Sequence, residues 1–421
     1  MLKMFFSFLK DNPLARGSLI LFVGSFLAGV LSYIFNAIMG RMLGPEDYGA
    51  FASLVSLTYI TGVPAGTIAV VVAKKMAELQ AKNEMTKSRP FVGYVAKQSA
   101  IFGVVVFLIF LVLIPLIMGF LKIESFWAVL ILGLSLLVSF VSAVPSGGLR
   151  GLEKFFEISW SSIFSALTRI GLGVLFVLVG WRVAGGLFAA LCADILVTLV
   201  IFHYLRLPKE RTVLAREDTK LSSFALPVFF VTLFMAVLYN ADVVLAKHFL
   251  DTTNAGYYAI LSLLGKIIFF GTASIGVVIF PITAKNHSLG LDNSRILKLS
   301  LWLTFIASAM VTAIYFVFPD LVIKILFGAS YLPVSPYVGL MGIVFVFYSL
   351  LNILVSYALS CGRTGISYIL AGGALVEILA LFLFHGSLGE IIYAMILVMA
   401  MTLGGLVIYL KYGRMVKKWI L

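Results

Sequence analysis

Long uninterrupted apolar runs, separated by short polar segments, dominate the pattern along the chain. A membrane-spanning helix needs about 20 mostly apolar residues, and twelve runs reach that length. The runs are continuous, whereas the strands of a membrane barrel alternate apolar and polar positions. The pattern therefore predicts an all-α integral membrane protein with twelve transmembrane helices, at about 17–39, 49–73, 99–120, 126–148, 158–180, 184–205, 222–247, 256–281, 299–318, 336–358, 365–384 and 388–410.

Composition supports lipid as the main solvent of the chain. Of its 421 residues, 62% are hydrophobic and 12% are charged, against about 45–50% and 25% in soluble domains. The two cysteines, Cys192 and Cys361, are expected to be unpaired thiols, and the four histidines lie far apart in sequence. We expect no metal site and no cofactor. The first ten residues, MLKMFFSFLK, are typical of a short amphipathic stretch on the membrane surface.

The basic residues of the loops predict the orientation. Of the 31 Lys and Arg residues, 24 lie on the side that holds both termini and five on the other, with Arg169 and Lys266 inside spans. Because Lys and Arg are in excess in cytoplasmic loops, both termini are predicted to lie in the cytoplasm. We expect the protein to reside in the cell (plasma) membrane. The net charge of +13 is thus a sign of topology, and no nucleic-acid partner is needed to explain it.

An internal repeat divides the chain near residue 207, in the charged segment RLPKERTVLAREDTK. Each half has six predicted spans, an even number, so both halves enter the membrane from the same side. This pattern indicates a parallel repeat, with domains at 1–206 and 207–421. The ends of spans 1 and 7 match at an Asn-Ala pair, at a Gly, at an aromatic residue and at an Ala: Asn36 and Asn240, Ala37 and Ala241, Gly49 and Gly256, Phe51 and Tyr258, Ala52 and Ala259.

Five short motifs, in order along the chain, resemble those of the polysaccharide and O-antigen flippases. These flippases, which move lipid-linked oligosaccharides, belong to the multidrug/oligosaccharidyl-lipid/polysaccharide exporter superfamily. Each motif alone has low specificity, but the five occur at the matching spans. They are GRMLGPEDYG from Gly40, GLRGLEKF from Gly148, Asn240-Ala-Asp242 with Gly256-Tyr-Tyr, LFGASYLPVSP from Leu326, and CGRTG from Cys361.

The resemblance implies two six-helix bundles around a central cavity lined by spans 1, 2, 7 and 8. It implies a transporter, not an enzyme, that moves a polyprenyl-pyrophosphate-linked oligosaccharide from the cytoplasmic to the outer leaflet by alternating access. The identity of the sugar, the polyprenol and the coupling ion lies beyond the resemblance. Expected partners are the lipid-linked oligosaccharide, membrane lipids, and glycosyltransferases and a polymerase of the same pathway. We expect a monomer.

Charged residues inside spans need a partner or a function, because a charge at the bilayer centre costs at least about 2.5–3.5 kcal/mol on insertion. Arg169 in span 5 and Asp194 in span 6 lie 12 and 13 residues from Trp181 in the turn between the spans. At a rise of about 1.5 Å per residue they reach the same depth. They are predicted to form a structural ion pair; the alternative is that Arg169 is a cavity cation.

A transported pyrophosphate would require fixed cations, which Lys and Arg supply. Lys266 in span 8 is the first candidate, with Arg41 and Lys247 next. Lys266 could instead extend its amine to the membrane surface or pair with Asp242, although the depths of the two residues differ by about 9 Å. Arg41 could instead pair in solvent with the acidic residues of the turn after span 1. Asp242 is expected to hold one of the cations when the cavity is empty.

Three further polar residues complete the candidate site. Glu377, near the middle of span 11, replaces the neutral residue that is common in the flippases; it is either a coupling site, like Asp242, or a permanently hydrogen-bonded carboxyl. Asn36 and Asn240 either bind sugar hydroxyls or make interhelical hydrogen bonds.

Pro64, between Gly62 and Gly66, marks a bending point in span 2.

Three other functions compete with the flippase. An ion-coupled multidrug or metabolite antiporter of the same superfamily would have less need of cationic Arg41 and Lys266. A peptidoglycan-precursor flippase commonly has more than twelve spans. A membrane glycosyltransferase or ligase needs a large outer loop, and every predicted outer loop is short. The chain has no GxxxxGK[ST] motif, so we do not expect ATP to be the direct energy source.

Overall fold

The computed structural model describes residues 13–205, 207 and 225–420, and these residues form helices and turns without strands. The predicted surface stretch at 1–10 and most of the charged segment after residue 207 lie outside the described residues. The helices of the first half, with one 3₁₀ turn, are α2 (Pro13–Thr61), α3 (Val63–Ala81), η1 (Met85–Lys87), α4 (Ser88–Leu121), α5 (Phe126–Gly151), α6 (Phe155–Leu178) and α7 (Arg182–Tyr204).

The second half is also helical, with one further 3₁₀ segment. Its elements are α8 (Ala225–Phe249), α9 (Thr252–Ser288), α10 (Ser294–Val317), α11 (Pro319–Leu326), η3 (Ala329–Val334), α12 (Ser335–Ser360), α13 (Ile366–Leu383) and α14 (Leu388–Ile420). Within the described residues, 11 helical segments are long and apolar enough to cross a membrane. The chain is therefore a multi-pass membrane protein, as predicted.

The difference between 11 segments and twelve predicted spans arises in α2. Its apolar part, Ile20–Thr61, has 42 residues, about 63 Å at the rise of an α-helix and twice the ~30 Å hydrocarbon core. The segment is not straight, because Gly44 has φ 72° and ψ 175°, a conformation open to glycine. Pro45 follows, and its fixed φ suits the first turn of a new helix. The predicted turn between spans 1 and 2 is thus a sharp kink, and the count of twelve stays a prediction.

A second break lies at the predicted bending point. Helix α2 ends at Thr61 and α3 begins at Val63, with Pro64 in its first turn. The Gly66 amide still donates to the Gly62 carbonyl over 3.1 Å, so the helix is bent and not lost. Pro64 has no amide hydrogen to donate at this position, which explains why the bend falls here.

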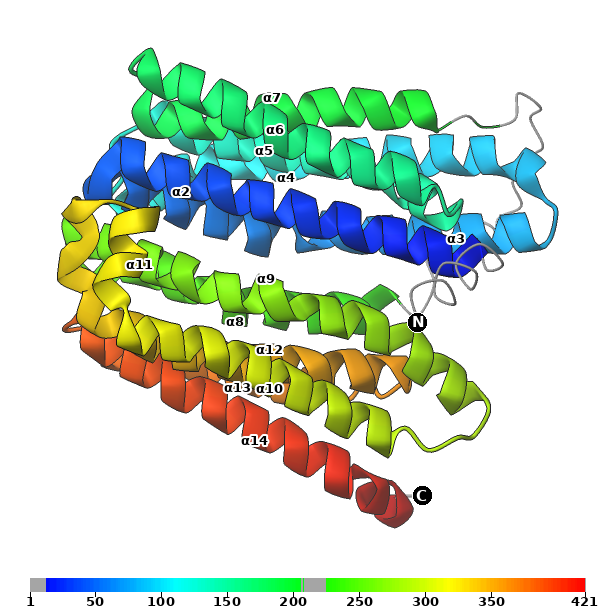
Figure 1. Ribbon diagram of the computed structural model, residues 1–421. Helices are drawn as coiled ribbons and strands as arrows, with labels where there is room; N and C mark the ends of the chain where they lie inside the picture. Colours follow the sequence, from blue (N-terminus) through cyan, green and yellow to red (C-terminus); the bar gives the residue numbers. More distant parts are fainter. Residues whose placement is uncertain (1–12, 206, 208–224, 421) are drawn as a thin grey trace, which may run out of the picture. The chain divides into compact units, whose positions relative to one another are not determined.

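Contacts divide the chain into two compact units, which are described separately. Unit 1 holds Met1–Phe35 and Thr61–Phe229, and unit 2 holds Asn36–Ile60 and Phe230–Leu421. In unit 1, α5 packs against α3, α4 and α7, and α6 packs against α7 (Figure 1). In unit 2, α12 packs against α9, α10 and α14. Residues 36–60 therefore pack with the second half of the chain, although the repeat assigns them to the first.

The start of α9 has a local cap that orients it. Asp251 precedes the helix and accepts a hydrogen bond from the Asn254 amide over 2.8 Å, the usual arrangement of an N-cap aspartate. This bond lowers the pKa of the Asp251 carboxyl below its ordinary value. The cap sets the start of the helix that carries Gly256, Tyr258, Ser262 and Lys266.

Candidate functional site

Helices α8 and α9 of unit 2 bring a lysine and an asparagine together. Lys266 Nζ donates to Asn240 Oδ1 over 3.3 Å, and Asn240 Nδ2 donates to the Ala236 carbonyl over 3.1 Å. Asn240 is 1% exposed, whereas Lys266 is half-buried. The Asn240 side chain is thus held by its own helix and presents its oxygen to the ammonium.

An aromatic cluster surrounds this lysine. Lys266 Nζ lies 4.6 Å from the centroid of the Tyr239 ring, within the ~6 Å range of a cation–π interaction. The Tyr239 ring in turn contacts Phe269, Phe345 and Tyr348, at centroid distances of 5.0, 5.9 and 5.1 Å. The neighbours of Lys266 described so far are thus an amide and an aromatic face, neither of which neutralises its charge.

Asp242 follows Asn240 by two residues in α8 but has different hydrogen-bond partners. Its Oδ2 accepts from the Tyr258 hydroxyl over 3.0 Å and from the Ser262 hydroxyl over 3.4 Å. Its Oδ1 is buried without a hydrogen-bond partner among the described residues. Within the same part of the chain, Asp242 and Lys266 do not form an ion pair, so the expectation that Asp242 holds a cation is not met for Lys266, although the two charges interact electrostatically.

Glu377 of α13 adds a second carboxyl near Asp242. Its side chain is 0% exposed, and neither carboxyl oxygen has a hydrogen-bond partner among the residues that the structure describes. The carboxyl interacts electrostatically with Asp242 and with the hydroxyls of Tyr258 and Tyr348. Because a buried polar group without a partner is costly, two such carboxyls in one unit mark a place where a proton or a metal cation would be favoured.

The other predicted residues of unit 2 lie elsewhere in it. Arg41 is exposed and donates to the carbonyls of Lys324, Ile325 and Leu326, with Nε at 2.9 Å from the last of these. It therefore caps the C-terminal end of α11, where helix carbonyls lack partners. Lys247 is buried in the last turn of α8, and Asn36 is half-buried in α2. Their roles toward a substrate stay predictions.

In unit 1, Arg169 of α6 and Asp194 of α7 form an ion pair. Arg169 Nη2 donates to Asp194 Oδ1 over 2.5 Å, which is the pairing that their nearly equal distance from Trp181 predicts. The side chains are 28% and 36% exposed, so the pair is partly open. Helices α6 and α7 also pack closely along their length, and the pair fixes their register.

We expect Asp194→Asn to lower the yield of folded protein, because it leaves Arg169 with a neutral partner. The expected loss of stability is about 1–3 kcal/mol, less than for a fully buried pair because both side chains are partly exposed. The charge swap Arg169→Asp with Asp194→Arg should recover part of the yield. Lys87→Gln, which removes the partly exposed pair of Lys87 with Glu84, is the control and should behave as wild type. Normal yield of Asp194→Asn would contradict a structural role.

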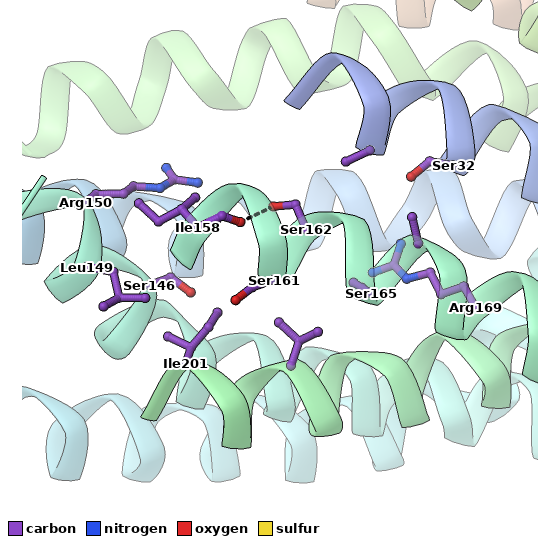
Figure 2. Close-up of a pocket in the computed structure, with 13 residues that line it drawn as sticks. Ser32, Ser146, Leu149, Arg150, Ile158, Ser161, Ser162, Ser165, Arg169 and Ile201 are labelled. Carbon is purple, nitrogen blue, oxygen red and sulfur yellow. Dashed lines mark hydrogen bonds between the residues drawn. The ribbon is translucent and has the colours of Figure 1, made fainter. Parts of the chain in front are cut away.

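Arg169 also lines a cavity of about 290 Å³ inside unit 1. Figure 2 shows Arg150 at one end and Arg169 at the other, with serines of α6 between them. The cavity is lined by Ala28 and Ser32 of α2, Ser146, Leu149 and Arg150 of α5, Ile158, Ser161, Ser162, Ser165, Ala166 and Arg169 of α6, and Val197 and Ile201 of α7.

The sequence predicts Asn240 but not the hydroxyl-bearing and aromatic side chains of unit 2, nor the serines that line the cavity of unit 1. The predicted charges of unit 2 are contacted by Tyr239, Tyr258 and Ser262. Of these three, the sequence pattern singles out Tyr258 alone, as part of the repeat. Their spacing was a usable signal, because Tyr258, Ser262 and Lys266 follow one another at intervals of four residues and so share one face of α9. The serines of α6 were overlooked because serine alone carries no charge.

The sequence profile described as "Polysaccharide biosynthesis protein" matches residues 14–287, which is more than half of the chain. No curated protein sequence matches this chain.

Solved structures of transporters have the same fold. A multidrug resistance MATE family transporter of the MOP superfamily, in an inward-facing conformation, is 15% identical, with a TM-score of 0.74 over 92% of this chain and 94% of its own. The lipid II flippase MurJ, in an inward closed conformation, is 15% identical, with a TM-score of 0.73 over 93% and 87%. A MOP superfamily transporter from Pyrococcus furiosus is 14% identical, with a TM-score of 0.63 over 94% and 96%. The chain therefore belongs to the polysaccharide biosynthesis protein family and has the fold of MOP superfamily transporters.

Proposed function

We propose that the protein is a flippase that moves a polyprenyl-pyrophosphate-linked oligosaccharide from the cytoplasmic to the outer leaflet by alternating access. The observation that carries this proposal is the setting of Lys266. In a chain of the polysaccharide biosynthesis family, a spanning helix holds a half-buried lysine whose bonded neighbour is the neutral Asn240. Such a cation keeps its charge available for an anionic ligand.

The chemistry of the head group matches this setting. A pyrophosphate carries compact negative charge, and it loses hydrating water when it enters a protein. An ammonium supported by an amide oxygen and the Tyr239 face attracts it with a charge-assisted hydrogen bond. Asn240 can in addition bond sugar hydroxyls when Lys266 turns to the phosphate. The partly buried ring of Tyr239 suits the apolar face of a sugar ring.

The two buried carboxyls provide a site for energy coupling. Asp242 and Glu377 lie in one unit, each with at least one oxygen that lacks a hydrogen-bond partner in the described residues. Uptake or release of a proton or of sodium here would change the charge beside Tyr258, which contacts Asp242. In this proposal the cation gradient acts through Asp242 and Glu377, and Lys266 binds the substrate.

A cation-coupled multidrug antiporter is the second candidate function. The observation that favours it is the fold, because the TM-scores to the MATE family transporter and to MurJ are almost equal, at 0.74 and 0.73. The fold therefore does not discriminate between the two substrate classes. The positive charge of Lys266 supports the flippase, since it would repel a cationic drug.

The test uses purified full-length protein in liposomes. One set of liposomes carries a lipid-linked oligosaccharide in both leaflets, and an enzyme added outside reports how fast the inner pool becomes accessible. A second set carries a fluorescent cationic drug and an imposed proton or sodium gradient. We expect faster oligosaccharide translocation and no drug movement. Drug movement without oligosaccharide translocation would replace the flippase with the antiporter.

The setting proposed for the flippase is the plasma membrane, with both termini in the cytoplasm. The substrate would be made by glycosyltransferases on the cytoplasmic side and used by a polymerase on the outer side.

A further inference from the structure

The cavity of unit 1 is bordered by polar side chains on the inward face of α6, where apolar side chains packed against a neighbouring helix would be usual. The residues of α6 that line it are 158, 161, 162, 165, 166 and 169, with alternating steps of three and one. This spacing is that of one inward face of a helix. Four of the six are polar, namely Ser161, Ser162, Ser165 and Arg169. A face built only for packing between helices would close the space, and here it borders about 290 Å³.

Two polar groups of the cavity, the Ser161 hydroxyl and the Arg150 guanidinium, can donate further hydrogen bonds. The Ser161 side chain is 1% exposed, and its hydroxyl has no hydrogen-bond partner among the described residues. Arg150 is exposed and lines the opposite end of the cavity from Arg169 (Figure 2). Within the described part of the chain, Arg150 has no acidic partner. Ser162, by contrast, already donates to the Ile158 carbonyl over 2.9 Å.

We infer that this cavity is a binding site for a phosphate group, with Arg150 and Ser161 as its principal ligands. Two guanidinium groups line it, and one is balanced by Asp194, so the cavity has an excess of positive charge. Guanidinium groups match the geometry of phosphate oxygens, and serine hydroxyls donate to the oxygens that remain. The exposed Arg150 would meet the ion at the entrance, and the buried Ser161 would bind it inside.

The size of the cavity limits the ligand. Pockets for drug-sized molecules occupy about 300–1,000 Å³, so a cavity of about 290 Å³ suits an inorganic phosphate or a single phosphorylated head group. An intact lipid-linked oligosaccharide would not fit. The inference goes beyond the flippase and does not depend on it, because the cavity belongs to unit 1, whereas Lys266 belongs to unit 2.

The test measures thermal unfolding of the full-length protein in detergent. A ligand that binds the folded state raises Tm with its concentration. Inorganic phosphate is titrated at constant ionic strength, so that general screening of charges stays the same. The variants are Arg150→Gln and Ser161→Ala. Their controls are Arg295→Gln, an exposed arginine at the start of α10, and Ser135→Ala, whose hydroxyl donates within α5 to Ile131.

We expect phosphate to raise Tm of the wild type and of both controls. Arg150→Gln and Ser161→Ala should each need at least a tenfold higher concentration for the same shift. Arg150→Lys keeps the charge without the planar fork and should lie between, which covers the case in which the glutamine variant folds poorly. Arg150→Gln should leave the translocation of lipid-linked oligosaccharide unchanged, because Arg150 belongs to unit 1 and Lys266 to unit 2, so a failure of the flippase proposal would be distinguishable from a failure here.

A second titration identifies the source of the phosphate group. Phosphatidic acid, which presents a phosphomonoester, is added to the detergent in place of inorganic phosphate. A response to phosphatidic acid alone that Arg150→Gln and Ser161→Ala weaken supports the site and assigns it to a lipid head group. If neither ligand shifts Tm, or if the two variants respond as the wild type does, the cavity is not a phosphate site.

Discussion

Lys266→Ala should reduce translocation of the lipid-linked oligosaccharide to about one hundredth of the wild-type rate while the protein still folds. Folding should survive because Lys266 is half-buried and Asn240 keeps its bond to the Ala236 carbonyl. Transport should fall by about 100-fold, the equivalent of about 2.8 kcal/mol. This is within the range of about 2–5 kcal/mol for loss of one partner of a desolvated, hydrogen-bonded charge pair. The measurement is the initial rate of translocation in liposomes, with the amount of monodisperse protein determined in parallel.

Charge and position can be separated with two further variants. Lys266→Arg keeps the charge but changes its geometry, so it should retain part of the activity. Lys324→Ala removes an exposed lysine of α11 in the same unit and should transport at the wild-type rate. Full activity in the double variant Lys266→Ala with Arg41→Ala would mean that the anion binds elsewhere, or that the substrate is not a pyrophosphate lipid.

The second large effect is expected from Gly256→Ala, which should sharply reduce the yield of folded protein. A methyl group at Gly256 would lie 1.7 Å from the Pro45 carbonyl oxygen, and one at Gly49 would lie 2.8 Å from the Gly256 amide nitrogen. These obstacles are backbone atoms, which cannot rotate out of the way. Helices α2 and α9 would have to separate, at a cost of at least about 1–3 kcal/mol. The measurement is the fraction of monodisperse protein after extraction from the membrane.

The same helix supplies a matched control for this glycine. A methyl group at Gly271 would have no atom within 4 Å, so Gly271→Ala in α9 should fold at least as well as wild type, because alanine favours the helix. If Gly256→Ala and Gly271→Ala give equal yields, the close approach of α2 and α9 is not needed for folding.

The fold was largely predictable because the membrane imposes simple rules. The long apolar runs correspond to helical segments, and the turn predicted after span 1 falls at Gly44, where the backbone leaves the helical conformation between two helical stretches of α2. A kink of one residue was hard to foresee, because GRMLGPEDYG contains enough polar residues to form a loop. The repeat identified Gly49 and Gly256 as equivalent. It did not show that the two glycines touch, because contact depends on how helices cross in space.

The site was only partly predictable. Nearly equal spacing from Trp181 was enough to predict the pairing of Arg169 with Asp194, because a tight turn holds the starts of neighbouring helices at one depth. The same estimate of depth separated Asp242 from Lys266. It could not supply Asn240 as the partner of Lys266, since hydrogen bonds between helices depend on rotation about the helix axes. Arg41 was expected to interact with acidic neighbours or with a substrate, and the carbonyls that it caps lie 283–285 residues away.

That long separation has a consequence for how the protein is made. Arg41 bonds to Leu326, and the Tyr331 hydroxyl donates to the Gly40 carbonyl over 2.8 Å. At a synthesis rate of about 5–20 residues per second, the partners of Arg41 emerge about 15–60 s after it does. During that interval residues 36–60 are without the complete remainder of unit 2, which begins at Phe230. These contacts can form only after residue 331 has been inserted, so we expect a nascent-chain intermediate in which Gly40 and Arg41 lack these partners.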